Sequence, residues 1–173
     1  MIKKGRNSDK KIHNQLHKYL SLLIFFHIVL KLQKFFTLFY TETFTKGGSI
    51  IMEKPEIIRD SLAQCIGTSQ YWKIFPGDFQ FYITDGVKAM YEMCEALWLV
   101  SAIFFDVHKD KIRREDFVVY KLTVNEDRSA VLVAEDGNYH KLSREEFTYT
   151  DFPLSEGIML YWCDNVLMLP SEY

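Results

Sequence analysis

The sequence predicts an α+β fold in which an antiparallel sheet of about five or six strands packs against one long and one short helix. Residues 85–108 repeat their apolar side chains at helical spacing, whereas the segments after residue 116 alternate apolar and polar side chains over short lengths. Turn-forming residues separate those segments, so we expect the strands to be joined as hairpins. Hairpin connections exclude a parallel, nucleotide-binding arrangement of the sheet.

The first predicted element is a short helix over residues 55–66. Pro55 suits a first helical turn, and Gly67 ends the helix. Four apolar residues share approximately one face of this helix: Ile57, Ile58, Leu62 and Cys65.

An aromatic-rich segment follows the short helix and contains a Pro-Gly turn at residues 76–77. Beyond that turn, residues 79–84 alternate apolar and more polar side chains, which predicts a half-buried strand. Thr84 or Asp85 can then cap the next helix by accepting backbone N–H bonds with a side-chain oxygen.

The long helix is predicted over residues 85–108. Its apolar stripe consists of Val87, Met90, Tyr91, Cys94, Leu97, Trp98, Ala102 and Phe105. No charged residue occurs over 96–105, so the second half of this helix is expected to be covered on nearly all sides by the protein core. An uncharged run of this length is too short to span a bilayer.

The remaining strands form an antiparallel series. They are predicted over residues 117–124, 130–136 and 146–152, with a final hairpin of 158–163 and 166–169. The loop at 125–129, the turn at Asp136-Gly137 and the turn at Asp164-Asn165 are rich in residues that favour hairpin turns.

Residues 1–51 differ in composition from the rest and are interpreted as an N-terminal extension to a single α+β domain, 52–173. The favoured interpretation is an upstream region translated in frame, because residues 46–48 can be encoded by a ribosome-binding sequence at a suitable distance before Met52. The alternative is a membrane-associated amphipathic helix whose lysines extend toward the lipid headgroups. The apolar run at 20–30 is too short to span a bilayer comfortably.

Charge is divided unevenly between these two parts. Residues 1–51 contain nine basic and two acidic residues, a net charge of +7, and residues 52–173 contain 12 basic and 21 acidic residues, a net charge of −9. Such an acidic domain repels phosphate, so we expect it not to bind nucleic acid through a broad cationic surface. A basic surface on a protein partner fits better, and membrane contact is expected only through residues 1–51.

Sequence motifs for metal, redox or nucleotide chemistry are absent. Cys65, Cys94 and Cys163 lie far apart and form no CxxC pair, which favours reduced thiols in the cytoplasm. Residues 52–173 contain no phosphate-binding glycine loop, no nucleophile elbow and no HExxH motif. We therefore expect no cofactor and no metal site, and we favour a protein that is not an enzyme.

Four isolated groups would form an active site only if the fold brought them together: Asp85, His108, His140 and Asp151. His108 is interpreted as a solvated loop residue and His140 as an exposed strand residue. Glu145 and Glu146 would point to opposite faces of a strand, so they are interpreted as a charged sheet edge that discourages strand addition.

Aromatic residues are concentrated around the turn at 76–77. The candidate partner-binding residues are Tyr71, Trp72, Phe75, Phe79 and Phe81. Few cations accompany them, unlike the stacking platforms that bind single-stranded nucleic acid. Packing against the long helix is favoured for the group as a whole, whereas a loop-borne Tyr71 and Trp72 pair is suited to a protein interface.

Five segments, taken in order, resemble an uncharacterised bacterial family that is classed as a domain of unknown function. They are "IGTSQYW" at 66–72, "YITDGVKAM" at 82–90, "LTVNEDRSAVLVAEDG" at 122–137, "YTDFPL" at 149–154 and "VLMLPSEY" at 166–173. The resemblance covers Met52 to Tyr173 and not the N-terminal segment. It implies a small, single-domain cytoplasmic protein of bacteria, phages or mobile elements, and it brings no catalytic residues with it.

Three functions are compatible with these observations. The favoured one is a small accessory protein, of a phage or mobile element, that engages a host protein through an acidic and aromatic surface. The alternatives are a small enzyme of unknown reaction and a regulator attached to a membrane through its N-terminal segment.

Overall fold

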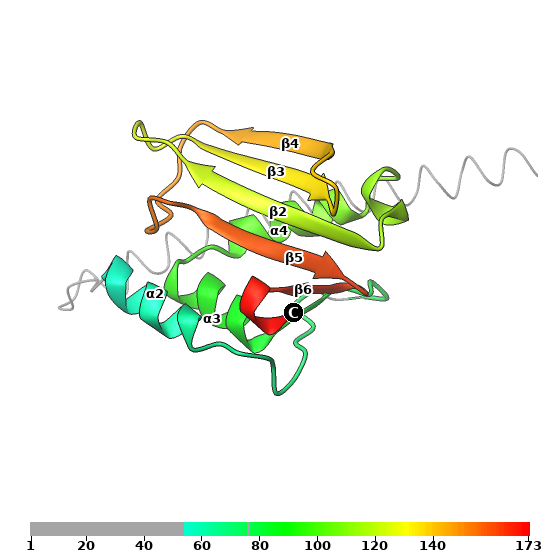
Figure 1. The fold of residues 1–173 in the computed structure, drawn as a ribbon, viewed down its shortest axis with the longest axis horizontal. Helices are drawn as coiled ribbons and strands as arrows, with labels where there is room; N and C mark the ends of the chain where they lie inside the picture. Colours follow the sequence, from blue (N-terminus) through cyan, green and yellow to red (C-terminus); the bar gives the residue numbers. More distant parts are fainter. Residues whose placement is uncertain (1–53, 76) are drawn as a thin grey trace, which may run out of the picture. The chain divides into compact units, whose positions relative to one another are not determined.

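Figure 1 shows a six-stranded sheet with helix α4 running behind it, in a computed structural model that describes residues 54–75 and 77–173. Residues 1–51 and Met52, which is interpreted as the start, lie outside the described residues, so the structure does not test these interpretations. Pro76 of the predicted turn also lies outside them. Residues Glu53–Tyr173 belong to one compact unit.

The described helices and strands do not follow one another as a simple series of hairpins. In chain order they are α2 (Pro55–Ala63), β1 (Tyr82–Ile83), α3 (Asp85–Met93), α4 (Leu97–Val107), the 3-10 turn η1 (Ile112–Arg114), β2 (Phe117–Val124), β3 (Ala130–Asp136), β4 (Lys141–Phe147), β5 (Ile158–Cys163), β6 (Val166–Met168) and the 3-10 turn η2 (Pro170–Glu172). This is an α+β fold, as predicted.

The sheet is mixed, so the prediction of a purely antiparallel sheet was wrong. Its strand order is β1-β6-β5-β2-β3-β4, and every neighbouring pair is antiparallel except β1 and β6. A hairpin turn fixes the relative direction of two strands, but β1 is followed by helices and is not bound by that constraint. It lies parallel to β6, the last strand of the chain, with Tyr82 opposite Val166 and Ile83 opposite Leu167.

The predicted long helix is two helices, α3 and α4. Glu95 lies between them in the left-handed conformation, with φ of 51°, and the Ala96 N–H bonds to the Tyr91 carbonyl at 2.9 Å. This bond and a left-handed residue are typical of a helix terminus, although glycine usually occupies that position. The break resets the helical phase, so Leu97 of the predicted apolar stripe is 45% exposed while Leu99 is buried.

Strand β4 begins and ends five residues before the predicted strand at 146–152. Its last residue, Phe147, lies opposite Ala130, which is the first residue of β3. No further β3 residue is present for Thr148 onward to pair with, so the chain leaves the sheet there. The Thr150 N–H then bonds to the Arg128 carbonyl in the preceding hairpin loop at 2.7 Å.

Two local predictions are confirmed by backbone geometry. Thr84 is the N-cap of α3, and its side-chain oxygen accepts a bond from the Val87 N–H. Asp164 and Asn165 both have positive φ, 50° and 66°, as a tight two-residue hairpin turn between β5 and β6 requires.

The core lies between α4 and one face of the sheet, which we call the inner face. On β2, Val118, Tyr120 and Leu122 point to the inner face and are buried, whereas Val119 and Lys121 point to the opposite, outer face and are partly exposed. The α4 side of the core is aromatic. The Phe104 ring stacks on Phe75 at 4.0 Å and contacts Phe81 edge-on at 5.4 Å, and Phe81 stacks on Trp162 at 4.9 Å.

The C-terminal residues hold the start of α3. The Glu172 carboxylate accepts bonds from the Gly86 N–H at 2.8 Å, the Thr84 hydroxyl at 2.5 Å and the Leu169 N–H at 3.0 Å. A carboxylate is favourable at the N-terminus of a helix because the first amide groups there lack partners within the helix. Glu172 therefore joins the last residues of the chain to the helix that follows β1.

Candidate functional site

The four isolated groups considered for catalysis are not bonded to one another. Among the described residues no hydrogen bond or ion pair joins any two of them: Asp85 bonds to residues 68–72, and His140 pairs with Asp136. His108 ends α4 and is half-buried against the Phe79 and Phe104 rings, so it is not the solvated loop residue that we predicted. Part of this burial comes from Phe79, which is distant in sequence.

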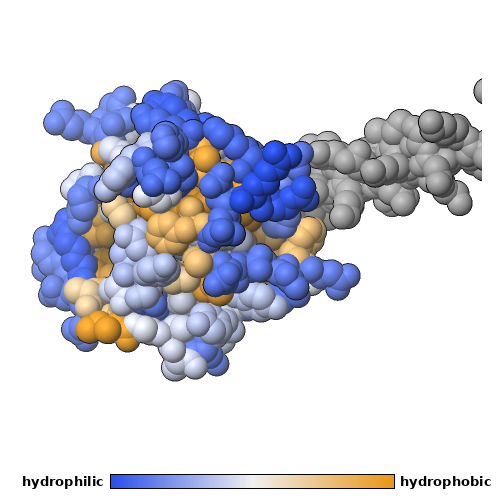
Figure 2. All heavy atoms as spheres, turned by 45° about the vertical axis from the view of Figure 1, so that its right-hand side comes forward, coloured by the Kyte–Doolittle hydropathy of each residue, from blue (hydrophilic) through white to orange (hydrophobic). Residues whose placement is uncertain are grey.

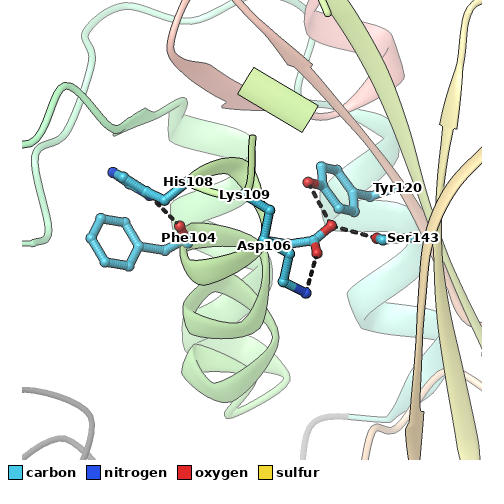
Figure 3. A network of polar contacts seen from close by, with 6 residues as sticks. All are labelled: Phe104, Asp106, His108, Lys109, Tyr120 and Ser143. Atoms are coloured by element: carbon cyan, nitrogen blue, oxygen red, sulfur yellow. Dashed lines mark hydrogen bonds and ion pairs between the residues drawn. The ribbon is translucent and has the colours of Figure 1, made fainter. Parts of the chain in front are cut away.

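A buried carboxylate that the sequence analysis did not single out lies at the centre of a polar network. Asp106, near the end of α4, is 3% exposed and points toward the inner face of the sheet. Figure 3 shows the Tyr120 hydroxyl of β2 and the Ser143 hydroxyl of β4 donating to one oxygen of Asp106, at 3.1 and 2.6 Å. The Lys109 ammonium pairs with the other oxygen at 2.6 Å.

This network is suited to fixing the fold rather than to proton transfer. Both oxygens of Asp106 have donors, and the Tyr120 hydroxyl has its acceptor, so the buried polar groups are satisfied. Burial, together with the adjacent Asp106 carboxylate, raises the pKa of Tyr120 well above its ordinary range. Tyr120 therefore stays protonated in the folded protein and acts as a donor to Asp106.

The raised pKa of Tyr120 predicts a loss of stability in alkali. In the unfolded chain Tyr120 ionises near pH 10, while in the folded chain it keeps its proton, so the unfolded state is favoured increasingly above pH 10. Between pH 8 and pH 11 we expect the parent protein to lose about 1.4 kcal/mol more free energy of unfolding than Tyr120→Phe. Urea unfolding at both pH values measures the difference. The exposed Tyr149 serves as the control, since Tyr149→Phe is expected to behave as the parent does.

The residues between α2 and β1 form a second polar arrangement, and this one lies at the surface. We call residues Gln64–Trp72 the Asp85 loop, because the first residue of α3 holds it in place. The Asp85 carboxylate accepts bonds from the Ser69 N–H at 2.8 Å, the Ser69 hydroxyl at 2.5 Å and the Trp72 indole N–H at 2.7 Å. The Thr68 hydroxyl in turn accepts a bond from the Asp85 N–H at 3.0 Å.

The same bonds stabilise the ionised form of Asp85. Donation by the Ser69 hydroxyl, and then by the Trp72 indole and the Ser69 N–H, lowers the pKa of Asp85 well below its ordinary range. Backbone bonds of 2.8 and 2.9 Å between Trp72 and Ile83 attach the end of the loop to the edge of the sheet. At neutral pH the loop is therefore fixed at several points along its length.

Large apolar side chains project from this fixed loop and from α2 beside it. Ile66 is 82% exposed, Tyr71 is 62% exposed and Ile57 on α2 is 50% exposed. Exposed Glu56 and Asp60 on α2 add negative charge to this part of the protein. Exposed apolar residues bordered by polar ones are typical of surfaces that bind other proteins.

The five candidate partner-binding residues are divided between the surface and the core. Phe75 and Phe81 are buried, at 6% and 0% exposure, and Phe79 is half-buried against α4. Tyr71 is exposed, and Trp72 is half-buried with the Lys88 ammonium 4.8 Å from its ring centre. A partner that contacts this region would therefore meet Tyr71 and the exposed part of Trp72.

A protein-family model matches residues 56–173, and it describes a family of unknown function, DUF6876. The chain belongs to this family. The match confirms the expected resemblance to an uncharacterised family and covers every described helix and strand except the first residue of α2. No curated protein and no solved structure gives a significant match.

Two features of this DUF6876 member were missed in the sequence. Ile66 was assigned to the short helix, but α2 ends at Ala63 and leaves Ile66 in the loop. Asp106 lies within the helix predicted over residues 85–108, and within α4, but the sequence analysis assigned it no role. A single aspartate directly after an uncharged helical run was the available signal, since a charge on a core helix requires buried partners.

Neither a spanning helix nor a metal cluster is found within residues 54–75 and 77–173. No helix there has the length and apolar character needed to cross a bilayer. No group of three or more histidine, cysteine, aspartate or glutamate side chains is placed there to hold a metal ion.

Proposed function

We propose that this DUF6876 member is a small, non-enzymatic binding protein that engages another protein through the Asp85 loop. The observation that carries the proposal is the rigid presentation of Ile66 and Tyr71 by a loop whose bonds converge on Asp85. Fixing a loop in its bound conformation reduces the entropy lost on association, so it favours affinity.

The composition of the surface indicates the chemistry of the partner. Tyr71 offers a large apolar ring with a polar hydroxyl, a combination that is frequent at binding hot spots. Glu56 and Asp60 on the neighbouring helix favour a partner with basic residues around an apolar contact. An accessory protein of a phage or mobile element that binds a host protein fits this description, as the resemblance in sequence suggests.

A pull-down with variants of the loop tests the proposal. The full chain, with an N-terminal affinity tag, is used to capture proteins from a lysate of the cells that carry the gene. Ile66→Ser combined with Tyr71→Ser is expected to lose a captured protein, because both exposed apolar contacts are removed. Asp85→Asn is expected to weaken capture by releasing the loop, without unfolding the domain.

Two controls separate a specific loss from a general one. Tyr149→Ser removes an equally exposed tyrosine outside the loop and is expected to retain the captured protein. Hydrogen exchange at the Ser69 N–H is expected to be faster in Asp85→Asn and unchanged in Asp60→Asn. If the double variant captures the same proteins as the parent, the Asp85 loop is not the binding surface.

A further inference from the structure

The outer face of the sheet is apolar where a solvated sheet face would be polar. In a sheet with one buried face, the side chains that point away from the core are usually polar. Here the outward residues of four adjacent strands include Val119, Val131, Val133, Met159, Tyr161, Cys163 and Met168. In Figure 1 helix α4 lies behind the sheet, and no α-helix of the described residues crosses in front of β2, β3 or β5.

The strand register makes these residues contiguous. Tyr161 lies opposite Val119 on one side and Met168 on the other, and Lys121 lies between Met159 and Val133. Adjacent strands are about 4.8 Å apart, so the side chains of neighbouring strands touch. Figure 2, turned from the view of Figure 1, shows apolar residues gathered at the middle of the visible face with hydrophilic residues around them.

An aromatic group continues this surface at the end nearest the C-terminus. The Phe117 ring is 5.0 Å from Tyr161 and 5.3 Å from Tyr173, and Tyr173 is 75% exposed. Aromatic residues and methionine are enriched at the centres of protein interfaces.

The charges on this face are balanced, in contrast to the rest of the domain. Residues 52–173 carry a net charge of −9, yet the apolar area contains one ion pair, between the Lys121 ammonium and the Glu135 carboxylate at 2.6 Å. A second ion pair, between Arg144 and Glu146 of β4, lies beside it on the same face. Two such domains repel each other through most of their surfaces but not through this one. A basic partner, conversely, would be drawn to the acidic surfaces elsewhere.

We propose that the outer face packs against the outer face of a second copy of this chain. Two sheets pack face to face through apolar side chains, and identical faces do so about a two-fold axis. Lys121 and Glu135 lie on adjacent strands, β2 and β3. An axis that runs along the strands between β2 and β3 therefore brings Lys121 of each copy near Glu135 of the other. The Asp85 loop is a separate surface, so this dimer does not depend on the proposed function.

Light scattering of the full chain across a range of concentrations tests the dimer. The parent is expected to have twice the monomer mass at high concentration. Lys121→Glu and Glu135→Lys, each alone, are expected to weaken dimerisation by roughly tenfold or more, because like charges then face each other twice in every dimer. Tyr149→Glu, outside the outer face, is the control and is expected to dimerise as the parent does.

Mixing the two single variants is the decisive step. In the mixture, the carboxylate introduced at position 121 of one chain faces the ammonium introduced at position 135 of the other. We therefore expect the mixed dimer to form although neither variant dimerises well alone. The ion pair within each chain stays broken in both variants, so this recovery cannot arise from repair inside one chain. A parent that remains monomeric, or a mixture that stays as monomeric as its components, would overturn the proposal.

Discussion

Replacing Gly157 with alanine is expected to lower the free energy of unfolding by about 3–5 kcal/mol. Gly157 precedes β5 and has φ of 76°, a conformation that costs a residue with a side chain about 1–2 kcal/mol. A Cβ at this position would lie only 1.8 Å from the Leu122 carbonyl oxygen of β2. Because the Leu122 oxygen is a backbone atom and the position of a Cβ is fixed by the backbone of residue 157, the collision is relieved only by moving β5 away from β2.

Gly67 provides the matched control for this substitution. Its φ of 74° is nearly the same, but no atom lies within 4 Å of the position that a Cβ would take. Gly67→Ala is therefore expected to cost only the backbone strain, about 1–2 kcal/mol. Urea unfolding of both variants measures the difference, and equal losses would show that contact with Leu122 is not the cause.

Removing the Asp106 carboxylate is expected to cost about 2–4 kcal/mol of unfolding free energy, because hydrogen bonds to buried charges are among the stronger ones. In Asp106→Ala the hydroxyls of Tyr120 and Ser143 lose their acceptor, and Tyr120 is only 1% exposed. Exposed Asp110, four residues later, is the control, and Asp110→Ala is expected to change stability by less than about 1 kcal/mol.

A double-mutant cycle shows whether the cost arises from the network. If Tyr120 is destabilising in Asp106→Ala because its hydroxyl is unpaired, then adding Tyr120→Phe removes that hydroxyl and relieves part of the loss. The double variant is expected to be less destabilised than the sum of the single variants, as measured by urea unfolding. Additive losses would mean that the two residues stabilise the fold independently.

Strand positions were predictable wherever a regular alternation lay between clear turn signals. Residues 117–124 and 130–136 were predicted with the bounds that β2 and β3 have. Alternation is informative there because one face meets the core at every second residue. Thr84 as a helix cap and Asp164-Asn165 as a turn were predictable for a similar reason, since each depends on local chemistry alone.

The errors occurred where distant parts of the chain decide the local structure. The helix break at Glu95 contains no glycine or proline, the residues that usually indicate a break. The parallel pairing of β1 depends on a strand more than 80 residues later. The end of β4 depends on where β3 begins. None of these three features can be predicted from a single short window of sequence.

The candidate binding residues were predictable as a group but not individually. Five aromatic residues near one turn indicated a concentration of apolar surface, yet alternation could not tell that Phe75 and Phe81 would pack against Phe104 while Tyr71 remained exposed. The outer face of the sheet carried a signal that was overlooked. Val131 and Val133 alternate with buried residues but are themselves apolar, which indicates a strand with two apolar faces.

The pairing of β1 with β6 affects how the protein is made. Residues 82–83 leave the ribosome long before residues 166–168, and long before Glu172, which holds the start of α3. This edge of the sheet therefore cannot close until residues 166–172 have left the ribosome. Until then the edge strand and the first turn of α3 lack their partners, so the newly made chain is exposed to misassociation before residues 166–172 arrive.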